Sequence, residues 1–273
     1  MPDNFIFDRL QDMVKTRKKA DETEEKDAVL VEDRQALSAQ DVVPRDFSGV
    51  FKKDLEEMFM AGIHFGYSRS SRHPKMKPYL FGLRNNVEIF DLEKTYVCLE
   101  KAKKFLEDLA KEGKKILIVA TKPGMHQLAE EAGRELNMPY VSERWLGGTL
   151  TNFKMIKGRI DYFIGLRQKK SAGELNKYTK KEISKFNKEL TRLERFLGGL
   201  EPLTNMPAAV LIIDTKKEKT AFRESKQMSI PIVAVVNSDS NPDGIAYPIP
   251  ANDNSPVSVK YLLNFLVKAY KEV

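Results

Sequence analysis

Two short stretches of the sequence carry residues of the kind that bind phosphate. In RWLGGTLTNF (144–153), a glycine pair stands beside two threonines, which either cradles a phosphate or forms a joint between structural units. In IVATKPGMHQLAEE (118–131), a predicted strand leads through Thr121, Lys122 and Gly124 into a helix, where doubly wound folds bind phosphate. One glycine is present there, whereas the dinucleotide fingerprint needs three and the P-loop ends in Gly-Lys-Ser/Thr. The phosphate-binding signal is therefore weak. An α/β enzyme that binds a nucleotide or a sugar phosphate is kept only as an alternative to the main interpretation developed below.

Residue types that act in hydrolysis or redox chemistry are scattered. His64, His73 and His126 lie far apart in the sequence, Cys98 falls within a predicted helix, and no serine occupies a Gly-x-Ser-x-Gly elbow. We therefore predict no catalytic residues, no metal site, no cofactor and no small-molecule substrate.

One segment at the end of a predicted strand has oxygen ligands. NSDSNPDG (237–244) carries Asp239 and Asp243. Asp, Asn, Pro and Gly are the ordinary residues of turns, and carboxylates also bind hard cations. The segment favours a structural turn, with a bound cation as the alternative.

The stretch HFGYSRSSRHPKMKPYLFGLR (64–84) is basic and rich in aromatic residues. No acidic residue occurs from Met58 to Val87, and Pro74 and Pro78 hold the backbone extended. Cations on such a loop suit phosphate contacts in RNA, and aromatic rings anchor the loop or stack on bases. We expect the cations to point outward and the aromatic residues to point inward: Phe65, Tyr67, Tyr79 and Phe81. The predicted RNA-binding residues of this loop are Arg69, Arg72, Lys75, Lys77 and Arg84.

Charge is divided unevenly along the 273 residues. The net charge is +7, yet residues 1–50 carry 8 Lys/Arg against 12 Asp/Glu, so the rest of the chain has a net charge of +11. A basic body favours a polyanionic partner. Residues 1–50 are predicted to be a charged, disordered leader with a short helix around Phe5–Val14, either an inert tail or a docking arm. The absence of a long apolar run, a signal core and paired cysteines predicts a cytoplasmic protein with no membrane partner.

Strands and helices alternate from about Val87 onward. Runs such as KILIVAT (115–121) are continuously apolar, as in strands buried on both faces. Alternation with short joints predicts a parallel sheet with helices on both faces. The α/β domain is predicted over residues 51–152 and 201–273. Its predicted strands are 87–92, 115–121, 138–145, 208–215 and 230–237.

Residues 153–200 interrupt this alternation. Two runs have apolar residues at intervals of three and four, which predicts a heptad-like seam, and KKSAGELNKYT (169–179) supplies the turn between them. We predict an inserted antiparallel coiled-coil hairpin. It carries 13 Lys/Arg against 5 Asp/Glu, whereas a merely solvated helical surface has balanced signs, so we predict an RNA or other acidic contact. Its predicted RNA-binding residues are Lys154, Lys157, Lys181, Lys185 and Lys188.

Two glycine pairs bracket the hairpin, which favours the joint over the phosphate cradle in RWLGGTLTNF. Gly198–Gly199 is expected to stop the second helix in a left-handed conformation, Thr149 or Thr151 to cap the first helix, and Trp145 to pack at the base. The predicted joint residues are Arg144, Trp145, Gly147, Gly148, Thr149, Thr151, Asn152, Gly198 and Gly199.

Four long motifs, in this order, resemble the bacterial ribosomal protein S2 family over about Leu55 to the C-terminus. They are AGIHFGYSRSSRHPKMKPYLFGLRNNVEIFDLEKT, ERWLGGTLTNF, FLGGLEPLTNMPAAVLIIDTKKEKTA and IPIVAVVNSDSNPDGIAYPIPANDN. The resemblance implies a Rossmann/flavodoxin-like α/β domain with an inserted coiled-coil hairpin. It also implies a non-catalytic role on ribosomal RNA between head and body of the small subunit, beside neighbouring proteins, with support for recruitment of ribosomal protein S1 and for translation.

The chain departs from the family pattern at three places. Tyr67 stands where the family has a histidine after HFG, which puts any histidine-dependent role there in doubt, and His73 stands where an asparagine is common. The loop NSDSNP (237–242) lacks the family's cysteine, which weakens the case for a metal at that loop.

Overall fold

The structure, a computed structural model, describes residues 49–271. The leader predicted over residues 1–50, except for its last two residues, and the helix predicted around Phe5–Val14 lie outside the described residues. The first described element is helix α3 (Gly49–Met60), in which Leu55 and Met58 are fully buried. The chain is therefore already part of the folded body at this helix.

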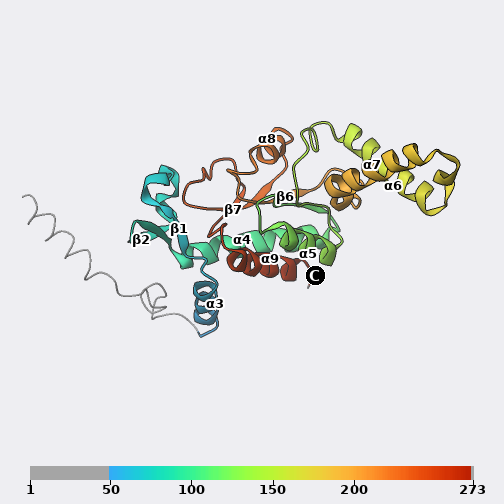
Figure 1. The fold of residues 1–273 in the computed structure, drawn as a ribbon. Helices are drawn as coiled ribbons and strands as arrows, with labels where there is room; N and C mark the ends of the chain where they lie inside the picture. Colours follow the sequence, from blue (N-terminus) through green and yellow to red (C-terminus); the bar gives the residue numbers. More distant parts are fainter. Residues whose placement is uncertain (1–48, 272–273) are drawn as a thin grey trace, which may run out of the picture. The chain divides into compact units, whose positions relative to one another are not determined.

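A five-stranded parallel sheet forms the centre of the fold (Figure 1). Its spatial order is β5-β4-β6-β7-β8, so that, counted from β4, the order is 2-1-3-4-5, as in flavodoxin-like doubly wound sheets. The side chains of the three central strands are all buried, which explains their continuous apolar sequences and confirms the predicted parallel sheet. These strands are β4 (Ile116–Val119), β6 (Ala209–Ile213) and β7 (Ile232–Val236).

Helices cover both faces of this sheet. Helices α4 (Leu92–Lys111), α5 (His126–Leu136) and α9 (Pro256–Lys271) pack together on one face, and α8 (Lys219–Gln227) lies on the other (Figure 1). The start of α4 is set by Asp91, whose Oδ1 accepts hydrogen bonds from the backbone N–H groups of the second and third helical residues at 3.2 and 3.4 Å.

A second, antiparallel sheet of three strands precedes the parallel one, with the order β1-β3-β2. It contains β1 (Phe65–Ser68), β2 (Leu80–Arg84) and β3 (Val87–Phe90). The strand predicted over 87–92 therefore does not begin the parallel sheet. The reason is local: Asn85 and Asn86 both have positive φ angles, 48° and 61°, as a two-residue hairpin turn requires, so β3 folds back onto β2.

The two edge strands of the parallel sheet differ from the sequence-based expectation. The strand predicted over 138–145 is only β5 (Tyr140–Val141), because the chain then leaves the sheet as Glu143 pairs with Arg195 at 2.6 Å and Trp145 turns into the core. Strand β8 (Tyr247–Pro250) was not predicted at all. It contains Pro248 and Pro250, which argue against a central strand but are tolerated at a sheet edge.

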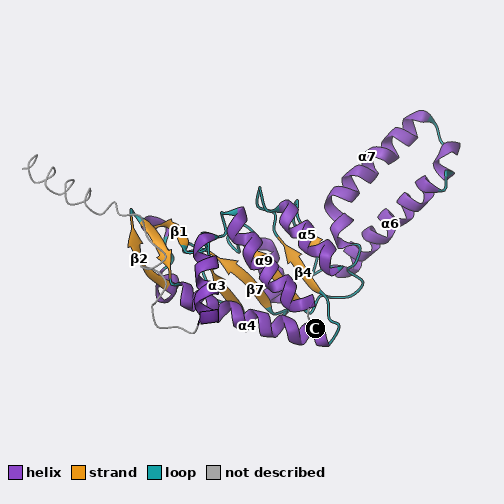
Figure 2. Ribbon diagram, turned by 90° about the horizontal axis from the view of Figure 1, so that it is seen from below, coloured by secondary structure: helices purple, strands orange, loops and turns teal. Residues whose placement is uncertain are grey.

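Two long helices, α6 (Phe153–Ser171) and α7 (Lys180–Leu197), follow the edge strand β5 (Figure 2). A short 3-10 turn, η3 (Glu174–Lys177), joins them, and α7 starts at a capping box formed by Thr179 and Glu182. Phe163 and Leu166 of α6 pack against Leu190 of α7 in a small apolar cluster of their own. Supercoiling of this helical pair stays a prediction.

Candidate nucleic-acid interface

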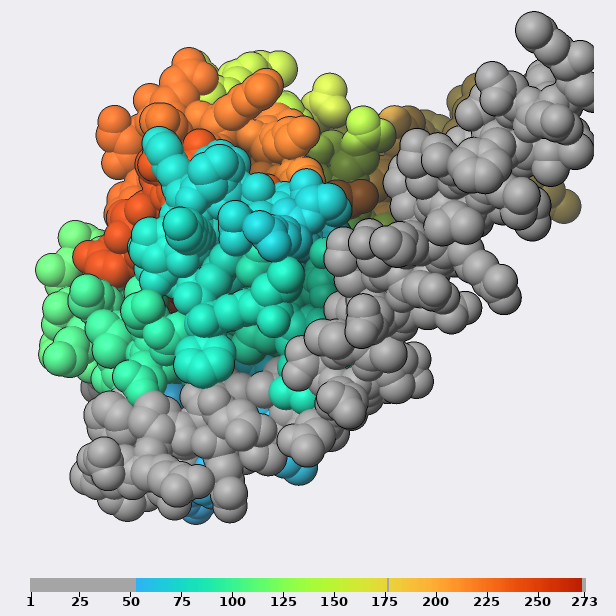
Figure 3. All heavy atoms as spheres, turned by 90° about the vertical axis from the view of Figure 1, so that its left-hand side faces the viewer, coloured from blue at the N-terminus to red at the C-terminus, as the bar shows by residue number. Residues whose placement is uncertain are grey.

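The basic loop between β1 and β2 is held rigidly against the parallel sheet. It contains two 3-10 helices, η1 (Arg69–Ser71) and η2 (Pro74–Tyr79). Met76 is fully buried, the backbone N–H of His73 donates to the Ser238 carbonyl at 2.8 Å, and the N–H of Tyr67 donates to the Ser238 Oγ at 2.8 Å. On the face in Figure 3, the loop (cyan) lies beside the segment after β7 (orange). Its cations are therefore presented by a fixed scaffold.

The five predicted RNA-binding residues of this loop fall into two groups. Arg69 and Lys77 are exposed, Arg84 is half-buried, and within residues 49–271 these three side chains have no ion-pair partner. Arg72 instead pairs at 3.1 Å with Glu88, a carboxylate only 2% exposed, and Lys75 pairs with Asp243. Arg72 therefore neutralises a buried charge of its own sheet, a role that the sequence did not reveal.

The expectation that the aromatic residues of the loop point inward is wrong for two of the four. Phe65 and Phe81 are 46% and 59% exposed, because alternate residues of a strand at the edge of a small sheet face solvent. Tyr67 and Tyr79 are half-buried. The Tyr67 hydroxyl donates to Asn254 Oδ1 at 2.9 Å, so the residue at this departure from the family pattern ties the loop to the end of the sheet.

His64 packs in the core and has no chemical role. Its ring is buried and stacks on Phe59, with ring centres 4.4 Å apart, and it touches Phe65 at 4.0 Å. Burial lowers the pKa of His64 to about 4, so the ring is neutral at physiological pH. A neutral ring between two phenyl rings is an apolar packing element.

The outward face of α7 carries a stripe of cations. In α7 the seam positions recur at intervals of three and four, and the cations recur in the same way on the opposite side of the helix. Four exposed cations form the stripe: Lys181, Lys185, Lys188 and Arg192. Arg195 continues the pattern but pairs with Glu143 at 2.6 Å. On α6, Lys154 is exposed, whereas Lys157 donates to the Thr204 carbonyl at 3.0 Å and so helps to hold the base of the pair.

The joint before α6 is organised by Glu224 of α8, a residue that the sequence did not single out. Its carboxylate accepts five hydrogen bonds, at 2.9–3.2 Å, from three backbone N–H groups, one indole and one hydroxyl. The donors are Trp145 Nε1, the N–H groups of Gly148, Leu150 and Thr151, and Thr151 Oγ1. The glycine pair and the threonines thus surround an anion supplied by the chain itself.

Burial raises the pKa of Glu224, but the hydrogen bonds from Trp145, Gly148, Leu150 and Thr151 outweigh it and lower the pKa overall. The carboxylate is therefore ionised in the folded chain at neutral pH.

Two expectations about the joint are corrected. No side chain caps α6, because Thr149 Oγ1 donates to the Leu146 carbonyl at 2.6 Å and Thr151 binds Glu224. Gly198 is right-handed, with a φ of −55°, so it is no left-handed helix stop. Gly199 serves another purpose, since a Cβ there would lie 2.7 Å from the Tyr140 ring and closer still to the Tyr140 carbonyl. At Gly148, in contrast, the backbone conformation requires glycine, because its φ is +89°.

The remaining predicted joint residues differ in burial. Trp145 is 8% exposed and belongs to the main core, as expected of a residue at the base of the helical pair. Arg144, Gly147 and Asn152 are exposed, and a Cβ at Gly147 would meet no atom within 4 Å. Gly147 is therefore not required by space.

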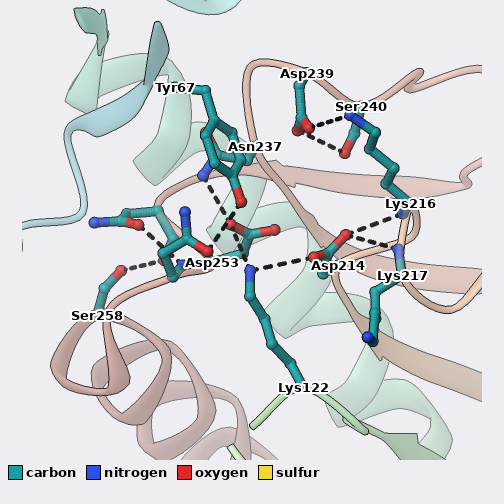
Figure 4. A network of polar contacts seen from close by, with 12 residues as sticks. Tyr67, Lys122, Asp214, Lys216, Lys217, Asn237, Asp239, Ser240, Asp253 and Ser258 are labelled. Carbon is teal, nitrogen blue, oxygen red and sulfur yellow. Dashed lines mark hydrogen bonds and ion pairs between the residues drawn. The ribbon is translucent and has the colours of Figure 1, made fainter. Parts of the chain in front are cut away.

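The place where an enzyme of this fold would bind phosphate, between β4 and β6, is filled by carboxylates of the chain (Figure 4). The Thr121 N–H and hydroxyl donate to Glu218 Oε1. Lys122 Nζ lies 3.2 Å from Asp214 Oδ2 and 3.3 Å from Asp253 Oδ1. A phosphate would have to compete with these anions for the same donors, so the enzyme interpretation is not favoured.

The Lys122 network has a pH dependence of definite sign. Burial, together with the nearby charge of Asp214, raises the pKa of Asp253 to about 6. Burial lowers the pKa of Lys122, but the carboxylates of Asp253 and Asp214 outweigh it and raise the pKa overall. An acid whose pKa is raised in the folded state lowers the stability of the protein as the pH rises toward that pKa. The reason is that the folded state keeps a proton that the unfolded state has released.

Replacement of Lys122 by methionine is therefore expected to destabilise the chain more at pH 7.5 than at pH 5. The loss should be about 3 kcal/mol at pH 7.5, since a buried carboxylate pair is left without its cation, and smaller at pH 5, where Asp253 takes up a proton. Urea unfolding at both pH values measures it, with the exposed Lys219→Met as control. Equal losses at the two pH values would contradict the assignment.

The cation alternative at Asp239 and Asp243 gains no support. Each carboxylate has a lysine partner, Lys216 at 2.7 Å for Asp239 and Lys75 for Asp243. Within residues 49–271, no group of three His, Cys, Asp or Glu side chains is placed to hold a metal ion. None of the helices in this range is both long and apolar enough to cross a membrane.

Comparison with known proteins gives one consistent result. The family model described as "Ribosomal protein S2" matches residues 58–273. A Dehalococcoides mccartyi protein named small ribosomal subunit protein uS2 is 40% identical over 209 residues, which cover 77% of this chain and 85% of the relative. Proteins of the same name from Dictyoglomus thermophilum and Bdellovibrio bacteriovorus are 40% and 39% identical over 218 residues, covering 80% of this chain and 89% and 70% of the relatives.

Proposed function

The chain belongs to the ribosomal protein S2 family, whose members are structural rather than enzymatic proteins of the small ribosomal subunit, and from this premise we propose that it binds the ribosomal RNA of that subunit. The binding uses two basic surfaces. The first, the loop surface, comprises Arg69, Lys77 and Arg84, and the second, the α7 stripe, comprises Lys181, Lys185, Lys188 and Arg192.

The observation that carries this proposal is that, in the described part of the chain, the cations of both surfaces are left without ion pairs. Within the described residues, none of these seven cations forms an ion pair, although Arg72, Lys75 and Arg195 beside them do. Structural cations of this chain thus have partners, whereas the cations of the two surfaces are solvated and available for phosphates. The contacts are with the RNA backbone, so they fix position and give little direct sequence readout.

Replacement of Arg69 and Lys77 by alanine is expected to weaken binding to small-subunit RNA and to lower its salt dependence. Each lost phosphate contact should reduce the slope of log affinity against log salt by about 0.7–0.9. Charge reversal of Lys181, Lys185 and Lys188 should act more strongly in the same direction. Filter binding of the full chain at several salt concentrations measures both, and gradient sedimentation of lysate measures incorporation into subunits.

Two variants serve as controls for this prediction. Reversal of Lys101 and Lys104, which are exposed on α4, changes net charge without touching either surface and should leave the slope unchanged. Arg72→Ala should lower stability rather than the slope, because it leaves Glu88 buried and unpaired. Unaltered affinity and slope in the Arg69 and Lys77 variant would remove the loop surface from the interface.

Further parts of the proposal rest on family membership. We place the chain in the cytoplasm within the small subunit, between head and body, in contact with neighbouring ribosomal proteins, where it acts in translation. Support for the recruitment of ribosomal protein S1 belongs to the same proposal, and retention of that protein by subunits that carry the chain is the measurement for it.

A further inference from the structure

One side of the helical pair has a groove at its base. The groove has a volume of about 510 Å³ and is lined by Leu146 and by residues of both helices. Those that matter here are Arg159, Tyr162, Glu189, Arg192 and Phe196. A second hollow of about 270 Å³ shares Leu146 and Arg159 with it and reaches the joint at Gly147 and Gly148. The two hollows are therefore neighbours, with Leu146 and Arg159 lining both.

The chemistry of the groove combines aromatic and guanidinium groups. Tyr162 is 50% exposed, Phe196 is half-buried, and Arg159 and Arg192 are exposed. In the described part of the chain, neither arginine has an ion-pair partner. An exposed ring beside solvated guanidinium groups is the combination on which single-stranded nucleic acids stack a base and place its phosphates.

The opposite side of the same helical base provides a contrast. A larger hollow of about 760 Å³ there is lined by Arg167 and Arg195, among others. Arg167 forms two hydrogen bonds to Glu201, at 2.6 and 2.8 Å, and Arg195 pairs with Glu143 at 2.6 Å. The arginines on that side fasten the helical pair to the α/β body. Arg159 and Arg192, on the groove side, form no such ion pair within the described residues.

We propose that the groove between Tyr162, Phe196 and the two arginines Arg159 and Arg192 holds one unpaired nucleotide of the RNA. The base stacks on Tyr162, and its phosphates lie at the guanidinium groups. This inference rests on the proposed RNA-binding function and adds a site to it. It also assigns the occupant by charge, because a groove with two unpaired cations and one carboxylate attracts an anion. Glu189 already interacts with the Tyr162 hydroxyl, so it helps to hold the ring in place rather than to select the base.

Replacement of Tyr162 by alanine is expected to lower the affinity of the full chain for small-subunit RNA by about 5- to 20-fold at fixed salt. The slope of affinity against salt should stay unchanged, because no cation is lost. Tyr162→Phe should keep the affinity, since the ring remains. Arg159→Gln or Arg192→Gln should instead lower the slope. Chemical probing should find one unpaired nucleotide protected by the unaltered chain and by Tyr162→Phe, but reactive with Tyr162→Ala.

The matched controls come from the same helical pair. Tyr178 near its tip is also exposed, at 41%, and Tyr178→Ala should retain both affinity and protection. Arg195→Gln removes a cation from the opposite side and should not lower the slope. Circular dichroism and the thermal midpoint show that each variant is folded.

The possible failures are distinguishable. If the unaltered chain does not bind the RNA, the proposed function fails together with the groove. If the loop and stripe variants weaken binding but Tyr162→Ala does not, the groove alone is refuted. If Tyr162→Ala weakens incorporation only when other ribosomal proteins are present, the groove contacts a protein and the nucleotide assignment is wrong.

Discussion

Replacement of Glu224 by alanine should destabilise the chain by about 4 kcal/mol, because it leaves buried hydrogen-bond donors without their acceptor. The carboxylate accepts five hydrogen bonds from the segment between β5 and α6, from Trp145 to Thr151. Trp145 and Leu150 are buried, so their N–H groups would need water to enter the core or the loop to open. A chain of this size should lose roughly 10 °C in thermal midpoint.

The matched control is Gln227→Ala, which truncates an exposed side chain on the same helix and should cost little. A pH series sharpens the test. The folded-state pKa of Glu224 is lowered, so its contribution is present above the ordinary carboxyl pKa and is lost as the pH falls through the folded-state value. The alanine variant should therefore approach the stability of the unaltered chain in acid. A deficit of the same size at all pH values would show that packing, not the carboxylate, is responsible.

Replacement of Gly199 by alanine should cost about 3 kcal/mol and misplace the helical pair. A Cβ at this position would overlap the backbone carbonyl of Tyr140, which cannot rotate away, as well as the Tyr140 ring. Tyr140 is the first residue of β5, so either the edge strand or the return from α7 must move. Chemical denaturation measures the loss of stability, and incorporation into subunits measures the displacement.

Gly147→Ala is the control for this prediction, because that Cβ would meet no atom within 4 Å and the residue has no positive φ. It should leave both stability and incorporation unchanged. Comparable losses for the two alanine variants would mean that flexibility of the joint, rather than close approach at Gly199, is what the glycines provide.

Much of the α/β body could be predicted from the sequence because its signals are local. Continuous apolar runs gave β4, β6 and β7, since a strand buried on both faces has no polar side. The same reasoning failed for β8, whose two prolines look incompatible with a sheet until the strand is seen at an edge. The strand β3 was predicted, but its place in a separate antiparallel sheet was not, because the positive φ angles of Asn85 and Asn86 turn the chain back onto β2.

The candidate sites were predictable in type but not in detail. The cations of residues 64–84 and of α7 could be found by counting charges, because residues 58–87 contain no acidic residue and residues 153–200 hold 13 Lys/Arg against 5 Asp/Glu. Which of these cations are free to bind phosphate could not be predicted from the sequence. Arg72 and Lys75 look like Arg69 and Lys77, yet their partners are Glu88 and Asp243. The groove at Tyr162 likewise joins residues of two helices that no single periodicity connects.

By itself, the sequence determined the class of the fold, the presence of an inserted basic helical segment and, through four motifs, the family. These depend on periodicity, composition and order, which are properties of neighbouring residues. Only the tertiary structure decided that the glycines and threonines of RWLGGTLTNF bind a carboxylate of the chain itself, because Glu224 lies 79 residues away from Trp145. It also decided which cations remain unpaired, since an ion pair depends on distance in space and not on separation along the chain.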